Sequence, residues 1–343
     1  MATMSLDYLI IEQFLTDALK ARALQAAFEL SIIDALADQQ SIVASELLTG
    51  IKCDAEGGLF LLQMLASNHV VAIDDGSVSL TENFRKALPF RDLLTTKLKF
   101  STLVAADYFS NLPNLLQSED AFMQSSKLFE LFDYGRCLEV TTANCMHASQ
   151  WMQITTMLTR YEAAVCHNHY DFGQHSKMLD IGGNSGEFCV QICRRSPELT
   201  AQVFDLPVVC QVGQRHVSQS AESAQITFCA GDMLQDVFPA GCDLITWKSV
   251  LHDWPDQHLP DLLQKSFHAL EPGGRLLIFE RQRWDFAKEA TPYGLLPVML
   301  FFRSYRNPDH YQHALTNAGF TDVRLQQVQL EVPFLLITAT KAG

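Results

Sequence analysis

The segment DIGGNSG, residues 180 to 186, could bring the backbone close to a bound ligand. Gly182, Gly183 and Gly186 can adopt backbone conformations that other residues avoid, so the chain can turn sharply after a strand and before a helix. Asp180 at the head of the segment adds a negative charge. A short glycine-rich loop is weak evidence alone, and its meaning depends on the acidic residues that follow.

Two further carboxylates occur at matching places in the next strands. Asp205 lies nineteen residues after the glycine segment and is followed by Leu206. An acidic residue there can accept hydrogen bonds from both hydroxyls of a ribose. Asp232 lies in the sequence Gly231-Asp232-Met233, where the carboxylate could accept from an adenine amino group and Met233 could pack on the ring. Together these residues predict a nucleotide site at the ends of successive strands.

The glycine spacing favours S-adenosylmethionine (SAM) over a dinucleotide. A dinucleotide loop has the pattern G-x-G-x-x-G, which directs a helix N-terminus at a pyrophosphate. This chain has D-x-G-x-N-x-G and lacks the third glycine in that register. Asp180 could instead support the cationic amino group or the sulfonium side of SAM. We therefore expect SAM as the methyl donor and S-adenosylhomocysteine as the product.

The segment WKSVLHDWPD places His252 just after a predicted strand. A histidine has an ordinary pKa near 6.5, so it can accept a proton at neutral pH. Glu280 ends the apolar run LLIFE and could hold the imidazole ring and stabilise its charged form. The alternative is a structural histidine in a loop. A histidine base suits a phenol better than an aliphatic alcohol, because their pKa values lie closer.

The elements that position these residues follow from hydrophobic patterning. From Lys177 onward, the short apolar runs KMLDIG, AQVFD, ITFCAG, CDLITW and RLLIFE alternate with helical patterns, which predicts an α/β domain with a parallel sheet. Because the carboxyl ends of such strands meet at one edge, the candidate residues should converge there. The runs TDVRLQQVQL and PFLLITATKAG should form an antiparallel hairpin at the sheet edge.

The first half of the chain is predicted to be mostly helical. Residues 10–37 have apolar residues at helical spacing, Ser45 and Asp54 stand near helix starts, and HVVAIDDGSVSLTEN predicts a hairpin around an Asp-Gly turn. This winged-helix order serves either DNA binding or pairing with a second copy. Residues 91–176 are helical in pattern and rich in aromatic residues and methionine. We expect domains at 1–100 (dimerisation), 101–176 (helical linker) and 177–343 (SAM-binding).

Composition narrows the possible partners. The 343 residues carry 39 acidic and 25 basic side chains, a formal charge of −14, which disfavours nucleic acid and anionic membranes as partners. No apolar run approaches the ~20 residues that span a bilayer, and the start lacks a signal-peptide pattern. We expect a cytoplasmic protein. The nine scattered cysteines suggest reduced thiols, and Cys166, His167, His169 and His175 match no zinc module, so no metal is expected.

The chain resembles the SAM-dependent O-methyltransferases that include plant caffeic-acid and flavonoid enzymes, hydroxyindole O-methyltransferase and bacterial tailoring enzymes. The likeness covers nearly the whole chain, through ALQAAFELSIIDAL, LDIGGNSG, FDLP, GDM, WKSVLHDWPD, EPGGRLLIFE and NAGF. It implies a winged-helix-like dimerisation domain, a class I methyltransferase domain with a Rossmann-like sheet, a homodimer and no metal. It also implies His252 as general base, Glu280 beside it, and SAM contacts from Gly182, Asp205, Asp232, Met233 and Lys248.

Three residues depart from the family pattern. Asn184 stands where glycine is usual, Leu296 where aspartate is common, and Tyr305 where a second glutamate usually precedes Arg306. The loss of two carboxylates predicts a flat, rather apolar aromatic or heteroaromatic acceptor, which the resemblance associates with secondary metabolism, as a pigment or antibiotic intermediate. The residues expected to line its pocket are Met146, Trp151, Met152, Asp253, Leu296, Met299 and Tyr305.

Two other functions remain compatible with these patterns. A SAM-binding enzyme on this scaffold could methylate nitrogen or carbon, or could use SAM without methylating, because fold does not fix function. A winged-helix regulator could use the second domain as a ligand sensor. The acidic charge and the His252–Glu280 pair oppose the regulator.

Overall fold

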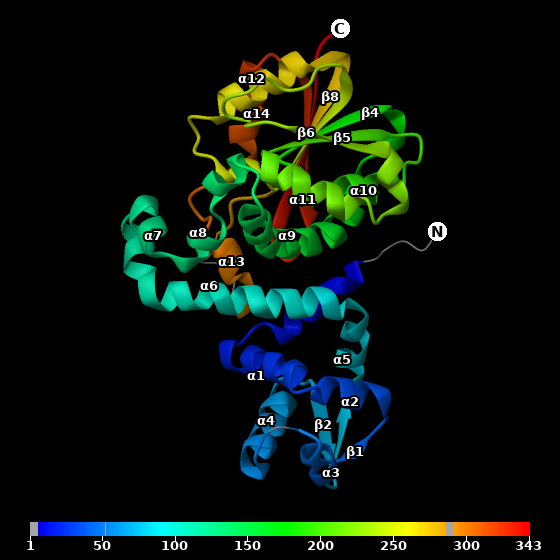
Figure 1. Cartoon of the computed structure of the whole chain (residues 1–343), viewed down its shortest axis with the longest axis vertical. Coiled ribbons are helices and arrows are strands. Elements are labelled where there is room, and N and C mark those ends of the chain that lie inside the picture. The colour runs from blue at the N-terminus through cyan, green and yellow to red at the C-terminus, as the bar shows by residue number, and fades with distance from the viewer. Residues whose placement is uncertain (1–5, 52, 286–290) are drawn as a thin grey trace. The chain divides into compact units, whose positions relative to one another are not determined.

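The computed structural model describes residues 6–51, 53–285 and 291–343. The described residues divide into two compact units, the first made of 6–51, 53–126 and 291–300 and the second of 127–285 and 301–343 (Figure 1). Residues 291–300, although late in the chain, thus belong with the N-terminal unit. The domain boundaries expected at residues 100 and 176 remain a prediction.

The first unit is mostly helical, and polar side chains cap some of its helices. Asp17 accepts a hydrogen bond from the Lys20 amide (2.9 Å) and Asp54 accepts one from the Gly57 amide (2.7 Å), which satisfies amides left free at the helix starts. The helical elements are η1 Leu6–Phe14, α1 Ala18–Glu29, α2 Ile32–Asp38, α3 Ala44–Thr49, α4 Ala55–Ser67, α5 Glu82–Ala87, η2 Leu88–Phe90, α6 Arg91–Gln117, α7 Glu119–Ser125, η7 Tyr293–Leu295 and α13 Leu296–Met299.

A three-stranded antiparallel sheet completes this unit in the order β1-β3-β2, with β1 Ile42–Val43, β2 Val71–Asp74 and β3 Ser77–Leu80. Asp75 (φ 45°) and Gly76 (φ 76°) turn the chain between β2 and β3 in the left-handed conformation that two-residue hairpin turns require. The predicted hairpin is therefore confirmed, and helices followed by this hairpin give the winged-helix order.

The second unit is built on a seven-stranded sheet in the order β6-β5-β4-β7-β8-β10-β9. The first five are parallel to one another, whereas β10 pairs antiparallel with both β8 and β9, so that β9 and β10 form the antiparallel hairpin that the sequence predicted at the sheet edge. The strands are β4 Lys177–Ile181, β5 Thr200–Asp205, β6 Ile226–Ala230, β7 Cys242–Lys248, β8 Leu270–Arg281, β9 Thr321–Gln329 and β10 Pro333–Thr340.

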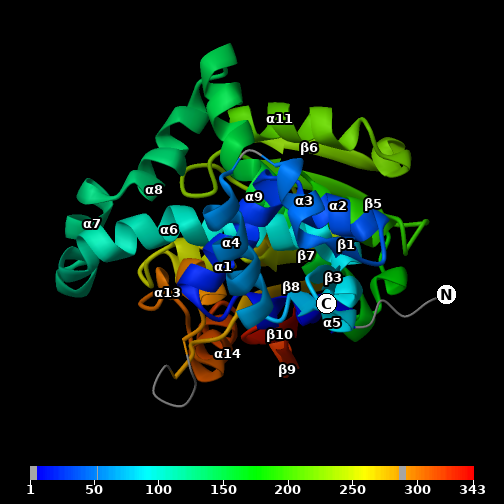
Figure 2. The ribbon, with the colours of Figure 1, turned by 90° about the horizontal axis from the view of Figure 1, so that it is seen from below.

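Helices cover both faces of this sheet. Figure 1 shows α10 and α11 on one flank and α12 and α14 on the other, and Figure 2 shows α11 and α14 on opposite sides of the strands. The helical elements of this unit are α8 Lys127–Leu131, η3 Tyr134–Leu138, α9 Thr142–His169, η4 Phe172–Gln174, α10 Glu187–Cys193, α11 Pro207–Val217, η5 Ala221–Gln225, η6 Leu251–Asp253, α12 Leu259–Ala269 and α14 Pro308–Asn317.

The central strands are apolar on both faces because both faces are covered. Ile245, Trp247 and Ile278 are completely buried in a core that also includes Leu263 from α12 and Tyr311 from α14. Burial of such side chains stabilises the fold by roughly 1.5–3 kcal/mol each. A rigid sheet therefore fixes the carboxyl ends of β4, β5, β6, β7 and β8, after which the candidate residues lie. These observations confirm the predicted fold class.

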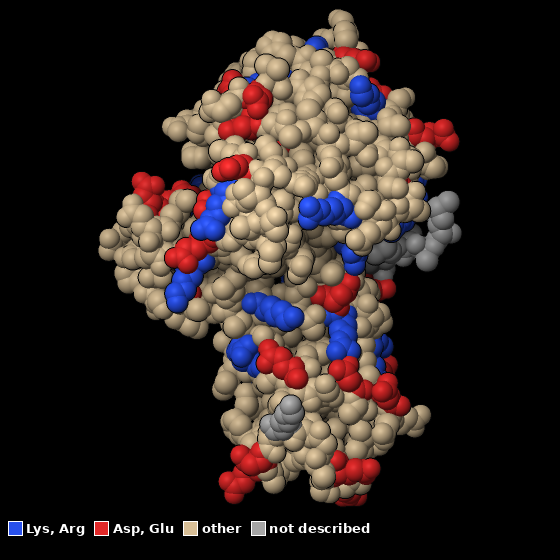
Figure 3. All heavy atoms as spheres, in the orientation of Figure 1, with Lys and Arg blue, Asp and Glu red and all other residues tan. Residues whose placement is uncertain are grey.

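On the face that Figure 3 shows, acidic and basic side chains are scattered among uncharged residues. None of the described helices is long and apolar enough to cross a membrane. The nine cysteines all lie in described parts of the chain, where each is a free thiol, and all except Cys53 and Cys229 are buried.

Candidate functional site

The glycine loop after β4 has the sharp turn that the sequence predicted. Gly182 (φ 66°), Asn184 (φ 56°) and Gly186 (φ 77°) are all left-handed. A Cβ placed on Gly182 would lie 2.8 Å from Val250 Cγ1, so the close packing requires glycine. Asn184 adopts the same conformation at modest cost, because asparagine tolerates this region better than most residues, and its Oδ1 accepts a hydrogen bond from the Ser185 amide (2.7 Å).

Asp205 at the end of β5 is held by the backbone. Its Oδ2 accepts from the Asn184 amide (2.8 Å) and its Oδ1 from the Leu206 amide (2.7 Å). Burial raises the pKa of Asp205 to about 6, although these two amides favour its charged form. The carboxylate is therefore fixed beside the glycine loop with lone pairs left for hydroxyl donors, as a ribose site requires.

Asp232 and Met233 follow β6, which pairs in parallel with β5, so they lie at the same edge of the sheet as Asp205. Asp232 Oδ1 accepts from the Leu234 amide (2.9 Å), and the Gly231 amide donates to the Asp205 carbonyl (2.9 Å). Met233 Cε would lie 3.3 Å from a Cβ on Gly182. The methionine thus borders the glycine loop, where a flat ring could pack against it.

Asp180 makes its hydrogen bonds inside the domain. Its side chain accepts from Thr246 Oγ1 (2.6 Å) and contacts the Cys189 thiol (3.7 Å), and only 1% of the residue is exposed. Burial raises its pKa to about 7. A Cβ on Gly183 would lie 2.6 Å from Asp180 Oδ2, so this carboxyl packs directly under the loop. Its contacts favour a role in supporting the loop.

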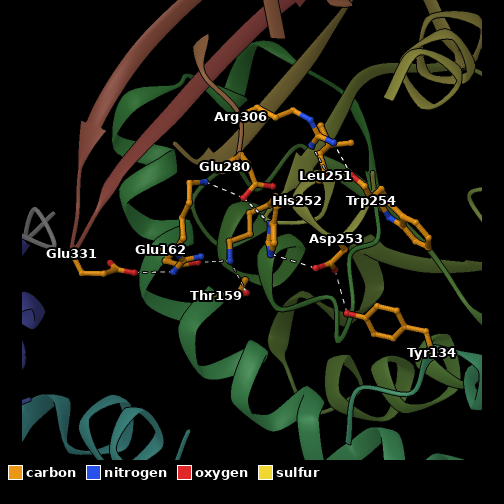
Figure 4. Close-up of polar contacts among 12 residues, drawn as sticks. Tyr134, Thr159, Glu162, Leu251, His252, Asp253, Trp254, Glu280, Arg306 and Glu331 are labelled. Atoms are coloured by element: carbon orange, nitrogen blue, oxygen red, sulfur yellow. Dashed lines mark hydrogen bonds and ion pairs between the residues drawn. The ribbon is translucent and has the colours of Figure 1, made fainter. Parts of the chain in front are cut away.

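Lys248 belongs to a buried ionic network that sequence reasoning missed. Its Nζ donates to Thr159 Oγ1 (3.0 Å) and pairs with Glu162 on α9. Glu162 also accepts from Arg281 (2.6 Å), which pairs with Glu331 (2.8 Å; Figure 4). Burial opposes the charge on Glu162, but the two cations lower its pKa to about 2. The positive charge predicted to contact SAM is thus compensated by a carboxylate.

His252 and Glu280 form the predicted pair. His252 Nδ1 lies 2.9 Å from Glu280 Oε1, and His252 Nε2 lies 3.4 Å from Asp253 Oδ1. Because a carboxylate accepts at Nδ1, the neutral ring carries its proton there and presents a lone pair at Nε2. Burial lowers the pKa of His252, but Glu280 and Asp253 outweigh burial, so the pKa rises above its ordinary value.

The loop that carries His252 is anchored by Arg306. Its guanidinium donates to the carbonyls of Leu251 (2.7 Å) and Trp254 (2.6 Å), one on each side of the base (Figure 4), and to Asp256 Oδ1 (2.7 Å). The Leu251 carbonyl also accepts the Trp254 amide (3.3 Å), so the guanidinium adds a second donor there and supplies a side-chain donor to the Trp254 carbonyl. Sequence reasoning named Arg306 only as a family landmark, and its contacts identify it as the support of the base loop.

Aromatic rings flank His252 where the family usually has a glutamate. The Tyr305 ring centroid lies 5.3 Å from that of His252, and the Phe301 centroid lies 4.9 Å from it in an edge-to-face arrangement. Burial raises the pKa of Tyr305, so its hydroxyl stays neutral. The base therefore has Glu280 at Nδ1, Asp253 near Nε2 and apolar ring surface beside it.

The residues expected to line the acceptor pocket come from both units, and their common pocket stays a prediction. Trp151 and Met152 on α9 are buried against Val208 and near Leu206, whereas Met146 is 66% exposed. Leu296 and Met299 belong to the first unit, while Asp253 and Tyr305 belong to the second. One residue that sequence reasoning missed joins the site: Tyr134 donates to Asp253 Oδ2 (3.2 Å). No sequence signal marked it among the aromatics of the helical segment.

The hydrogen-bond acceptors at the strand ends fit an adenosyl cofactor. Carboxylates at Asp205 and Asp232 match ribose hydroxyls and an amino group, and Met233 offers an apolar surface to a ring. Within the described ranges, no group of three or more His, Cys, Asp or Glu residues is arranged to hold a metal ion. His175, one of the histidines weighed as a ligand, instead contacts the Tyr170 hydroxyl (2.6 Å).

Comparison with known proteins places the chain in a family. Residues 119–321 match the O-methyltransferase domain, and residues 12–85 match the O-methyltransferase dimerisation domain. The first match alone covers more than half of the 343 residues.

Individual relatives agree with this assignment. Acetylserotonin O-methyltransferase of Bos taurus is 32% identical over 186 residues, 52% of each chain. Demethylspheroidene O-methyltransferase of Rhodobacter capsulatus is 34% identical over 160 residues, 45% of this chain and 38% of that protein. The matched stretches thus span about half or less of these two relatives.

A solved structure shares the fold over almost the whole chain. The human N-acetylserotonin methyltransferase in complex with SAM has a TM-score of 0.73 and 24% identity, and covers 95% of both chains. With the motifs after β4, β5, β6, β7 and β8 and the two domain matches, the resemblance noted in the sequence is confirmed, and this chain belongs to the O-methyltransferase family.

Proposed function

We propose that this chain transfers a methyl group from SAM to the hydroxyl of an aromatic or heteroaromatic small molecule, with His252 as the general base. The observation that carries the proposal is the His252–Glu280 pair on a loop that borders the predicted nucleotide site. Val250, two residues before the base, packs on Gly182, and Asp253 is near enough to raise the pKa of Asp205.

The side chains at the strand ends have distinct tasks in this proposal. Asp205 accepts hydrogen bonds from the ribose hydroxyls, while Asp232 and Met233 bind the adenine. The backbone turns at Gly182 and Gly186 leave room for close approach. Bound SAM supplies an electrophilic methyl group on a sulfonium. Holding two reactants in alignment can by itself contribute about 7–11 kcal/mol to lowering the barrier.

His252 removes the proton of the acceptor. The lone pair at Nε2 takes the hydroxyl proton as the oxygen attacks, and Glu280 at Nδ1 stabilises the resulting imidazolium (Figure 4). General-base catalysis of this kind typically contributes ~10²–10⁴-fold in rate. A phenol, with a pKa near 10, matches a histidine far better than an aliphatic alcohol.

The surroundings of the base favour a flat acceptor. The ring centroids of Phe301 and Tyr305 lie 4.9 and 5.3 Å from the centroid of the imidazole. Aromatic faces and edges at this distance suit stacking with another ring. A role in secondary metabolism is part of the proposal and rests on the bacterial tailoring enzymes that the motifs resemble.

The dimerisation domain at residues 12–85 supports a homodimer. We expect light scattering coupled to gel filtration to give about twice the mass of 38.5 kDa. A mass near that of one chain at micromolar concentration would contradict this part of the proposal.

The decisive experiment separates binding from chemistry. Calorimetric titration with SAM and S-adenosylhomocysteine tests the cofactor, and a panel of hydroxyaromatic compounds with labelled SAM tests transfer. In His252→Ala we expect kcat to fall by about 10²–10⁴-fold with SAM affinity nearly unchanged. The matched control is His268→Ala on the exposed side of α12, which should keep both. Unchanged turnover in His252→Ala would exclude this residue as the base.

The same panel distinguishes the alternatives. A product that carries the methyl group on nitrogen or carbon would contradict O-methylation. Loss of transfer when the acceptor hydroxyl is already methylated would support O-methylation. Binding of generic DNA in a gel-shift assay at low salt would instead favour a regulator.

A further inference from the structure

We propose that Tyr134 is a positioning residue for the reaction: it holds Asp253 against Nε2 of His252 and thereby tunes the base. The inference rests on the proposed function of His252, to which it adds a second support on the side opposite Glu280. Tyr134, Asp253, His252 and Glu280 form a continuous chain of polar contacts (Figure 4).

The two oxygens of Asp253 face different partners. Oδ2 accepts a hydrogen bond from the Tyr134 hydroxyl (3.2 Å), and Oδ1 lies 3.4 Å from His252 Nε2. Nε2 is the ring nitrogen that Glu280 does not occupy. Without the tyrosine, the Asp253 side chain could rotate away from the imidazole, because no other described hydrogen bond to its carboxyl group is present.

Tyr134 itself has little freedom. It begins the short helix η3, whose start is capped by Asp133 through the Gly135 amide (3.1 Å). Its ring packs edge-to-face on Trp151, with centroids 5.6 Å apart, and Trp151 is only 3% exposed. A hydroxyl carried by so constrained a ring can hold a carboxylate in one orientation.

The hydrogen bond from Tyr134 affects the pKa of Asp253, because several charged groups surround this carboxyl. Burial and Glu280 raise the pKa of Asp253, while His252 and Tyr134 lower it, and the net pKa is raised. Burial and Asp253 raise the pKa of Tyr134 well above its ordinary value, so the phenol stays a donor. The titratable or charged groups that face His252 and Asp253 are Glu280, Arg281, Tyr134, Tyr305 and Asp205.

The direction of the effect follows from these signs. Removal of the tyrosine hydroxyl takes away a bond that favours the charged carboxylate, so the pKa of Asp253 should rise. A less ionised Asp253 raises the pKa of His252 less, so the pKa of His252 should fall. The base would then be neutral at lower pH, but the imidazolium formed in the transfer would lose part of its stabilisation.

The proton balance of the step is simple. The acceptor O–H bond breaks and its proton goes to His252 Nε2, while an O–CH₃ bond forms and the S–CH₃ bond breaks with its electron pair left on sulfur. The new Nε2–H then faces Asp253 Oδ1, which tethers the imidazolium until the product leaves. Tyr134 contributes by keeping that oxygen in place.

The first test is Tyr134→Phe, with Tyr170→Phe as the matched control. Tyr170 is likewise a tyrosine of the second unit, and its hydroxyl bonds His175 (2.6 Å) instead of Asp253. We expect kcat of Tyr134→Phe to fall about 5- to 30-fold and the acid limb of its pH profile to move to lower pH. Tyr170→Phe should keep the wild-type profile. An unchanged profile in Tyr134→Phe, or a shift to higher pH, would overturn the proposal.

A second readout does not depend on turnover. The His252 ring can be followed by NMR in histidine-labelled protein and assigned with His252→Asn. In Tyr134→Phe we expect its titration midpoint to move down by about 0.5 in pH, whatever methyl acceptor the protein uses. An unmoved midpoint would refute the inference about Tyr134, whereas failure of SAM binding in the wild-type protein would refute the proposed function alone.

A double-mutant cycle completes the test. If Tyr134 acts through Asp253, Tyr134→Phe should shift the His252 midpoint little when Asp253→Asn is already present. An equal shift in both backgrounds would show that Tyr134 acts through another route.

Discussion

The two halves of the candidate site are built from different kinds of bond. On the predicted cofactor side, Asp205 and Asp232 accept from backbone amides, and the loop turns on left-handed residues. On the base side, His252 is held by side chains, with Glu280 at one nitrogen and Asp253 at the other. Backbone bonds fix geometry locally. Side-chain bonds couple charges, so one substitution on that side changes the pKa of several groups.

The buried network next to the base should give the largest stability effect. Glu162→Gln leaves Lys248 and Arg281 with one carboxylate fewer in a buried setting, so we expect a loss of about 3–5 kcal/mol in the free energy of unfolding. Urea denaturation measures it. The control Glu198→Gln changes an exposed glutamate and should cost less than about 0.5 kcal/mol. Equal losses of unfolding free energy in both variants would show that Glu162 stabilises the fold no more than an exposed glutamate does.

Glu280→Gln should alter both rate and pH dependence. Burial lowers the pKa of His252 and Glu280 raises it most, so the variant should move the acid limb of kcat to lower pH. In the wild type we expect that limb above 6.5, the ordinary pKa of histidine, because Glu280 and Asp253 outweigh burial and raise the pKa of His252. We also expect kcat to fall about 10- to 100-fold, from loss of a charged hydrogen bond. An acid limb that stays in place would disconnect Glu280 from the base.

The cofactor side should respond in affinity alone. Asp205→Asn should weaken SAM binding about 10-fold, measured by calorimetry, with little change in kcat at saturation. Asp243→Asn is the matched control, because Asp243 also accepts from two backbone amides, those of Ser176 (2.8 Å) and Lys177 (3.0 Å), but at the opposite end of the strands. If both variants lost affinity equally, the effect would come from stability, and Asp205 would have no direct role.

The smallest effect should come from the glycine loop. Asn184→Gly keeps the left-handed backbone and loses one local side-chain bond, so we expect SAM affinity within about twofold of wild type. Asn184→Ala places a less tolerant residue at the same φ and should cost about 1 kcal/mol of stability. Thermal unfolding of the two variants gives the comparison, and a more stable alanine variant would contradict the argument from backbone strain.

The two sides also differ in how far sequence predicts them. Asp205, Asp232 and the His252–Glu280 pair follow strands in register, so strand-end placement alone brings them together. The contacts of Tyr134 and Glu162 could not be predicted in this way. Tyr134 and Asp253 are 119 positions apart, as are Glu162 and Arg281, and their meeting depends on how η3 and α9 pack.

Substituted family positions show the same limit. The exchange of a glutamate for Tyr305 was visible in the sequence, but its ring contact with His252 was not. The support that Asp180 gives from beneath the loop was also unforeseen, because hydropathy does not reveal that Thr246 on the neighbouring strand donates to it.

The hydrogen bonds that Arg306 makes to the base loop have a consequence for how acceptor preference can change. Its guanidinium donates to the carbonyls of Leu251 and Trp254, and the residue directly before it in the chain is Tyr305. The Tyr305 ring beside the imidazole is thus directly linked to the loop that carries His252. Substitution of Tyr305 should change which acceptor molecules fit beside His252. The loop that carries His252 should keep its position as long as Arg306 is present. Libraries aimed at new acceptors are best built around a fixed Arg306.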